Sequence, residues 1–158
     1  MPITVRLATS LDAESIHHLT EAAFAPLRSI YLPNSAALTN LAALTPSLHR
    51  LVAEESSQLL GTLRYTPLDN TLRIIGLAVH PHSRRRGVAR TLISSLLPIA
   101  REHHCTSLSL YTITQTGNIP IFQYLGFHLI SELPAEYSLS PTGDSLTEAY
   151  MQRPIPSQ

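Results

Sequence analysis

One stretch, residues 71–104, constrains the fold of this chain more than any other. It reads TLRIIGLAVHPHSRRRGVARTLISSLLPIAREHH: an apolar run, a short turn, and a basic glycine-containing segment that opens a long amphipathic one. The pattern predicts a strand, a tight turn and a helix. Backbone N–H groups at the start of a helix are unpaired and the helix dipole is positive there, so this turn is suited to holding an anionic group.

The turn carries Arg84-x-x-Gly87-x-Ala89, a spacing that differs from the glycine patterns of P-loops and of dinucleotide-binding folds. Gly87 permits close approach of a ligand to the backbone. The N–H groups of residues 85–90 could then wrap a pyrophosphate. The alternative is a solvated basic face at a helix start, and the motif alone leaves both interpretations open.

The remainder of the chain predicts strands and helices arranged around this unit. We expect strands over residues 4–8, 50–54, 59–66, 72–79, 107–112, 127–133 and 146–153. We expect helices over residues 11–24 and 35–44, after Gly87, and from about 118 to 125. Residues 26–33 and 135–145 are expected to be irregular.

Single residues refine these expectations. Ser10 is expected to cap the first helix, and Asn118 the last one. Gly76 inside a strand indicates a bulge or a close backbone approach. Pro98 is expected to kink or break the long helix, and Gly126 to end the last one.

Composition limits the class of protein. The chain has 158 residues, 44% of them apolar and 14% charged, which is typical of one globular domain over residues 1–158. All of its basic side chains are arginines, and the formal net charge is zero. We therefore expect no nucleic-acid or membrane partner. The single cysteine, Cys105, is expected to be buried, no metal site is expected, and the absence of a signal-like or membrane-length apolar run favours a cytoplasmic location.

Two motifs resemble the GCN5-related N-acetyltransferase superfamily. LAVHP at residues 77–81, followed by RRRGVA at residues 84–89, is similar to that family's strand and acyl-CoA pyrophosphate loop. Downstream, LYT at residues 110–112, Asn118 and LGF at residues 125–127 are similar to its later strand, helix and helix ending. The order of the elements agrees over nearly the whole chain.

The resemblance implies an α/β (α+β) fold with a mixed, mostly antiparallel central sheet flanked by helices. Two central strands would splay apart, and acetyl-CoA would lie in the cleft with its pantetheine arm along residues 77–79. No metal is implied. The residues implied in binding the cofactor are Leu77, Ala78, Val79, Arg84, Arg85, Arg86, Gly87, Val88, Ala89, Arg90, Asn118 and Phe122.

The implied reaction is direct acetyl transfer to a primary amine of a small molecule, peptide or protein, with the Val79 N–H stabilising the oxyanion. Many relatives place a tyrosine where this chain has Phe122, and some place a glutamate near Ile75 and Gly76. The remaining candidates for proton transfer are Tyr111 and a group of side chains that could act through water, namely Glu54, Glu55, His80 and His82. Glu54 is preferred among these four, because its strand is expected to border the acceptor side.

The alternative is a catalytically impaired acyl-CoA-binding or sensing module on the same fold. Both a monomer and a homodimer remain open.

Overall fold

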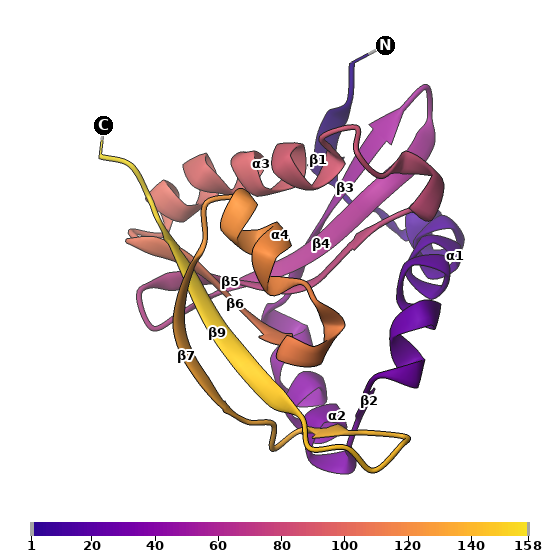
Figure 1. Ribbon diagram of the computed structural model, residues 1–158. Helices are drawn as coiled ribbons and strands as arrows, with labels where there is room; N and C mark the ends of the chain where they lie inside the picture. Colours follow the sequence, from indigo (N-terminus) through magenta and orange to yellow (C-terminus); the bar gives the residue numbers. More distant parts are fainter. Residues whose placement is uncertain (1, 158) are drawn as a thin grey trace.

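The computed structural model describes residues 2–157, and its centre is a seven-stranded sheet (Figure 1). The strand order is β1-β3-β4-β5-β6-β9-β7, and every neighbouring pair is antiparallel except β5–β6. The strands are β1 (Thr4–Leu7), β3 (His49–Glu55), β4 (Gln58–Leu68), β5 (Thr71–Val79), β6 (Ser107–Ile113), β7 (His128–Pro134) and β9 (Thr147–Pro154). The expected mixed, mostly antiparallel sheet is confirmed.

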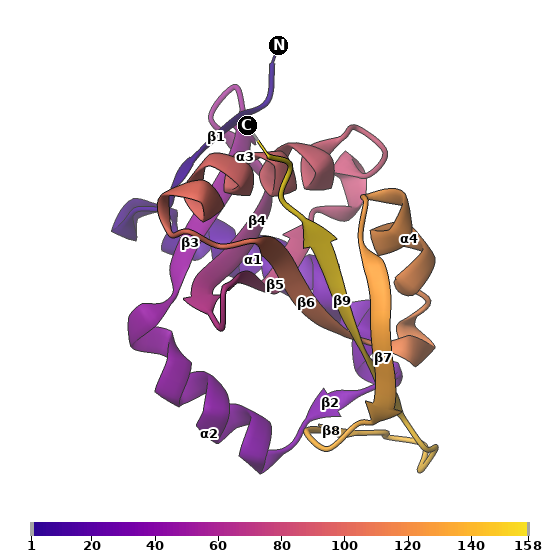
Figure 2. The same ribbon diagram turned by 90° about the vertical axis from the view of Figure 1, so that its left-hand side faces the viewer.

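Helices flank this sheet. They are α1 (Ala13–Phe24), α2 (Ser35–Leu44), α3 (Val88–Glu102) and α4 (Ile119–Tyr124), with short 3-10 turns at Ser10–Asp12, Ala25–Ser29, Thr45–Ser47, Pro81–Ser83 and Thr114–Thr116. Figure 2 shows α2 set apart from the strands, and none of its residues is buried. No helix in the described part of the chain is both long enough and apolar enough to cross a bilayer.

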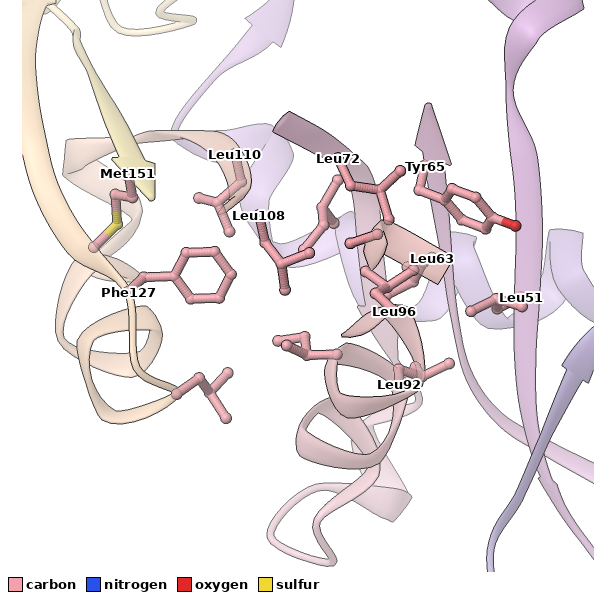
Figure 3. Close-up of a cluster of buried hydrophobic side chains, with 14 of the residues drawn as sticks. Leu51, Leu63, Tyr65, Leu72, Leu92, Leu96, Leu108, Leu110, Phe127 and Met151 are labelled. Atoms are coloured by element: carbon pink, nitrogen blue, oxygen red, sulfur yellow. The ribbon is translucent and has the colours of Figure 1, made fainter. Parts of the chain in front are cut away.

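The main core lies between the sheet and α3. The apolar stripe of α3 places Leu92, Ile93 and Leu96 out of solvent against Leu63 and other strand residues. Figure 3 shows part of this core, in which leucines from β4, β5 and α3 meet side chains from the C-terminal half. This packing fixes the start of α3 relative to the strands beneath it.

The two central strands, β5 and β6, separate after a short stretch of pairing. The parallel β5–β6 ladder joins only Thr71–Arg73 to Ser107–Ser109. The β4–β5 register shifts between Thr62 and Arg64, next to Gly76, whose φ is +71°. The expected bulge at Gly76 is confirmed, and the later part of β5 has no neighbouring strand on the β6 side.

Three local expectations were wrong in whole or in part. The chain enters the first helix through Thr9 and a 3-10 turn, with the Thr9 N–H donating to the Asp12 carboxylate at 2.7 Å, so Ser10 is not the cap. The long helix α3 continues through Pro98, so the break that was one of the two outcomes expected there does not occur. Asn118 stands at the start of α4, yet its side chain makes no capping hydrogen bond.

The two segments expected to be irregular also pair with each other. Residues Leu32–Pro33 form β2 and Ser138–Leu139 form β8, and the two run antiparallel as a separate two-stranded sheet. The partners are more than 100 residues apart, so no local sequence pattern could indicate this pairing. The ladder ties the entry to α2 to the loop before β9.

An ion-pair cluster fastens β1 to the helix that follows it. Arg6 donates to both Asp12 oxygens at 2.8 and 2.9 Å and to Glu54 at 3.0 and 3.2 Å. The hydrogen bonds from Arg6 and from the Thr9 N–H hold the pKa of Asp12 well below its usual range.

This cluster gives a pH-dependent contribution to stability. A carboxyl group with a lowered folded-state pKa stabilises the protein above its unfolded pKa of about 4, and that contribution is lost as the pH falls below it. We expect Asp12→Asn to lower Tm by a constant amount between pH 8 and pH 5, with a difference from the wild type that shrinks below pH 4. Thermal unfolding followed by circular dichroism across this range measures it, and a pH-independent difference would contradict the assignment.

Candidate functional site

Two adjacent cavities open where β5 and β6 diverge. The larger, of about 900 Å³, lies beside residues 84–90 and is called the loop cavity; the smaller, of about 490 Å³, lies beside Gly76 and is called the bulge cavity. Both volumes are in the range of small-molecule sites. The two cavities share a wall, which is formed by Phe24, Leu27, Leu77, Asn118 and Phe122.

The start of α3 forms the floor of the loop cavity. Gly87 precedes the helix in the left-handed conformation, with φ +77° and ψ 17°, and a Cβ there would meet nothing within 4 Å. The Thr91 N–H donates to the Gly87 carbonyl at 2.9 Å, which is the first helical bond. The N–H groups of residues 88–90 therefore lack helical partners and are available to an anion.

Gly61, which we did not single out from the sequence, brings α3 close to β4. A Cβ on Gly61 would lie 2.6 Å from Val88 Cγ1 and 3.2 Å from Leu92 Cδ1, so only glycine leaves room for the first turn of the helix. The available signal was an isolated glycine inside a strand, which often marks a close approach of another segment. Gly61 thus positions the floor of the loop cavity from below.

The arginines of the turn have different surroundings. Arg84, Arg85 and Arg90 line the loop cavity. Arg86 instead forms an ion pair with Glu55 at 2.7 Å, and its side chain is not among the cavity walls. The guanidinium of Arg90 lies 5.1 Å from the ring centre of Tyr124, which is 77% exposed.

The open edge of β5 offers backbone donors to the loop cavity. The His80 N–H donates to the Leu60 carbonyl at 2.8 Å, toward β4. Successive N–H groups of a strand point to opposite edges, so the Val79 N–H points away from β4. Leu77, Ala78 and Val79 all line the loop cavity. A strand-like ligand could therefore hydrogen-bond along this edge.

The bulge cavity contains Tyr111, Asn118 and Phe122, all expected from the sequence. Tyr111 is half exposed, and its ring centre lies 4.8 Å from that of Tyr150. Phe122 forms part of the wall between the cavities and supplies no hydroxyl group there. The cavity is otherwise mostly apolar, with Arg64 the nearest charge to the bulge.

Glu54 does not reach either cavity. Its carboxylate accepts hydrogen bonds from Arg6 at 3.0 and 3.2 Å, on the side of β3 that faces β1. The expectation that its strand borders the acceptor side was wrong, because β4 separates β3 from β5. Among the described residues, no group of three or more His, Cys, Asp or Glu side chains is arranged to hold a metal ion.

A helix start with unpaired N–H groups, an open strand edge and two adjacent cavities are suited to a long ligand with an anionic end. The chain matches the acetyltransferase (GNAT) family over residues 13–127 and belongs to that family. A search of curated proteins finds no match.

Solved structures share the fold over nearly their whole length. The ribosomal-protein-S18-alanine N-acetyltransferase of Escherichia coli is 17% identical, with 99% of this chain and 96% of that chain covered and a TM-score of 0.74. YncA of Salmonella typhimurium, solved with its cofactor acetyl-CoA, is 21% identical over 100% and 96% of the two chains, with a TM-score of 0.73. The PaiA N-acetyltransferase of Thermoplasma acidophilum, in complex with coenzyme A, is 15% identical over 98% and 99%, also with a TM-score of 0.73.

Proposed function

We propose that this protein is an acetyl-CoA-dependent N-acetyltransferase that moves an acetyl group to a primary amine by direct attack. The observation that carries the proposal is that the loop cavity and the bulge cavity lie side by side along the open edge of β5. The pyrophosphate of acetyl-CoA would lie on the N–H groups after Gly87. The pantetheine arm would extend along Leu77–Val79, which brings the thioester to the junction of the cavities.

The family and the ligands of its solved members support this assignment of the cofactor. YncA was solved with acetyl-CoA and PaiA with coenzyme A, and both share the fold of this chain. In our proposal Arg84, Arg85 and Arg90 attract the phosphates, and Asn118 contacts the pantetheine arm. Arg86 contributes its backbone N–H only, since its side chain is paired with Glu55.

The amine would enter through the bulge cavity and attack the thioester carbonyl. The carbonyl oxygen gains negative charge, which the Val79 N–H would stabilise. Holding both reactants in adjacent cavities supplies much of the rate. The amine passes its proton to water, and CoA leaves as a thiolate or takes a proton from Tyr111, whose side chain lines this cavity.

A second candidate function is a CoA-binding or sensing module with impaired catalysis. It is favoured by the wall at Phe122, which has no proton to donate, and by the absence of an acidic side chain at Ile75 and Gly76. Loss of general acid–base catalysis costs typically about 10²–10⁴-fold in rate, so it predicts a slow enzyme before an inactive one.

One experiment separates the two functions. The protein is incubated with acetyl-CoA and a panel of primary amines, release of free thiol is followed, and Tm is measured with and without CoA. We expect CoA to raise Tm and at least one amine to be acetylated. A rise in Tm without turnover of any amine would favour the sensing module, and no effect of CoA on Tm would contradict both.

Phe122→Tyr tests the missing proton donor. The new hydroxyl would lie in the wall shared by the two cavities, where it can protonate the departing thiolate. We expect kcat to rise at least about tenfold, toward the lower end of what general acid catalysis supplies. Phe122→Leu, which adds no hydroxyl, is the control and is expected to give no rise. Equal rates for the wild type and Phe122→Tyr would show that protonation of the thiolate does not limit turnover.

A further inference from the structure

Three arginines share the face of the sheet that carries the bulge cavity. Arg50 on β3 is registered opposite Arg64 on β4, and directly opposed residues of antiparallel strands lie on the same face. Thr66, two residues after Arg64, is registered opposite Arg73 on β5, and Arg73 is registered beside Ser109 on β6. Since alternate residues of a strand share a face, Arg50, Arg64 and Arg73 all lie on this one.

This arrangement opposes stability. Like charges placed directly opposite each other in a sheet are unfavourable. Burial lowers the pKa of both Arg50 and Arg64, and the charge of Arg64 lowers that of Arg50 further. Within the described part of the chain none of the three arginines forms an ion pair. A half-buried cation without a counter-charge costs free energy. Arg73 offsets part of this cost by lying over the rings of Tyr111 and Tyr150, at 4.8 and 5.5 Å from their centres.

Arg64 is the arginine left without a partner. Arg50 donates to the Thr62 hydroxyl at 3.0 Å, and Arg73 donates to the Ser109 hydroxyl at 2.8 Å. The Arg64 Nε is buried and has no hydrogen-bond acceptor among the described residues. The Nη groups, of which Nη2 lies toward Gly76, are therefore the donors that Arg64 could offer to a ligand in the bulge cavity that it lines.

The guanidinium of Arg64 also lies where the chemistry would take place. Its Nη2 lies 3.1 Å from the point that a Cβ on Gly76 would occupy, so the bare Cα of Gly76 makes room for it. Arg64 and Gly76 both line the bulge cavity. Gly76 directly precedes Leu77, which lies in the wall that the two cavities share. An acceptor whose amine faces the thioester would have its neighbouring group beside Arg64.

We propose that the acceptor carries a carboxylate beside its amine and that Arg64 binds this carboxylate, an inference that rests on the N-acetyltransferase function proposed above. The planar fork of a guanidinium matches a carboxylate with two parallel hydrogen bonds. The other arginine in the wall, Arg28, is already paired with Glu21 at 2.7 Å. Leu27, Ile74 and Leu110 make the remaining wall apolar. The substrate class that fits is an amino acid with an apolar side chain.

Matched acceptors test the carboxylate directly. Leucine and phenylalanine are compared with isoamylamine and phenethylamine, their decarboxylated counterparts, and with the aminophosphonate analogue of leucine, under saturating acetyl-CoA. Charge-assisted hydrogen bonds predict that kcat/KM for the amino acids exceeds that for the plain amines by about 10- to 100-fold. The aminophosphonate arm distinguishes a carboxylate site, which disfavours the larger tetrahedral group, from a phosphate site, which would prefer it and would overturn the assignment.

Arg64→Gln tests whether the preference for acceptors with a carboxylate depends on Arg64. We expect it to lower kcat/KM for leucine and phenylalanine by about 10- to 100-fold, to leave the plain amines and CoA affinity unchanged, and to keep or raise Tm because a buried like-charge neighbour is removed. Arg28→Gln is the matched control and should retain the preference for carboxylate acceptors. A fall in Tm, or an equal loss for both classes of acceptor, would make Arg64 a structural residue and overturn the inference.

Failure of this inference is distinguishable from failure of the proposed function. Acetylation without preference for the carboxylate would overturn the role of Arg64 and leave the N-acetyltransferase in place. Binding of leucine by calorimetry in the presence of CoA, lost in Arg64→Gln but without any acetylation, would uphold the carboxylate site and contradict the enzymatic function. If leucine is neither acetylated nor bound, the inference is overturned.

Discussion

Replacement of Gly87 by aspartate is expected to weaken the binding of CoA about 100-fold. A carboxylate roughly 5 Å from a pyrophosphate charge, at an effective dielectric constant of about 20, costs about 3 kcal/mol. The new side chain would meet no protein atom, since nothing lies within 4 Å of the Cβ position. The left-handed φ of +77° strains any side chain at this position, and this cost is shared by Gly87→Asn, so the difference in CoA affinity between the two variants should come from charge at the helix start.

Gly87→Asn provides the matched control. Asparagine has nearly the same size as aspartate and also tolerates the left-handed conformation that Gly87 adopts, with φ +77°. We expect it to weaken CoA binding much less than Gly87→Asp does, because it adds bulk without charge. Calorimetric titration of both variants at low and high salt measures the difference, which salt should reduce. Equal affinities of the wild type and Gly87→Asp would move the pyrophosphate away from the start of α3.

Phe127→Ala is expected to destabilise the fold by about 3–5 kcal/mol, which is typical for the loss of a buried phenylalanine. Phe127 is only 1% exposed and contributes to the main core beside Met151 (Figure 3). The corresponding fall in Tm is roughly 2–4 °C for each kcal/mol. Urea unfolding and thermal unfolding measure both quantities. Ile121→Ala, at a 56% exposed position of α4, is the control and should cost far less.

We expect Phe127→Ala to affect the proposed cofactor site as well. The Phe127 N–H donates to the Phe122 carbonyl at 3.0 Å, and their ring centres lie 6.0 Å apart. Loss of the Phe127 ring removes the support beneath Phe122, which separates the two cavities. We expect CoA to stabilise the variant less than the wild type at equal concentrations. Equal stabilisation would show that the wall at Phe122 holds its place without Phe127.

Features with a local cause could be predicted from the sequence. A glycine within a strand predicted the bulge at Gly76, and a glycine at the end of a helix predicted the turn at Gly126, whose φ is +97°. The motifs at residues 77–89 and 110–127 placed Val79, Asn118 and Phe122 near one another, and all three line the cavities. In each case the relevant partners are near in sequence or fixed by the order of the elements.

Features that depend on register could not be predicted. A slip of one residue moves every side chain of a strand to the other face, and only the paired strands settle which face it is. Glu54 was assigned to the acceptor side although its partner, Arg6, lies 48 residues away on an edge strand. Arg64 went unnoticed because its significance arises only from its register opposite Arg50 and its closeness to Gly76. The ion pair of the Arg86 side chain with Glu55 could not be predicted for a similar reason, since Glu55 lies on another hairpin.

The short ladder between β5 and β6 divides the sheet into two parts that are joined only at one end. One part is β1-β3-β4-β5 and the other is β6-β9-β7, and three registered positions join them. Ser109 links the two parts at this end, because its hydroxyl forms hydrogen bonds with Thr71 at 2.7 Å and with Arg73 at 2.8 Å. In the proposed function the thioester and the amine meet at the far end of the opening between the two parts, so a small rotation of one part of the sheet against the other about Ser109 would change the distance between them. In the proposed enzyme, the contacts of Ser109 at the closed end of the opening thus set the distance between the two reactants.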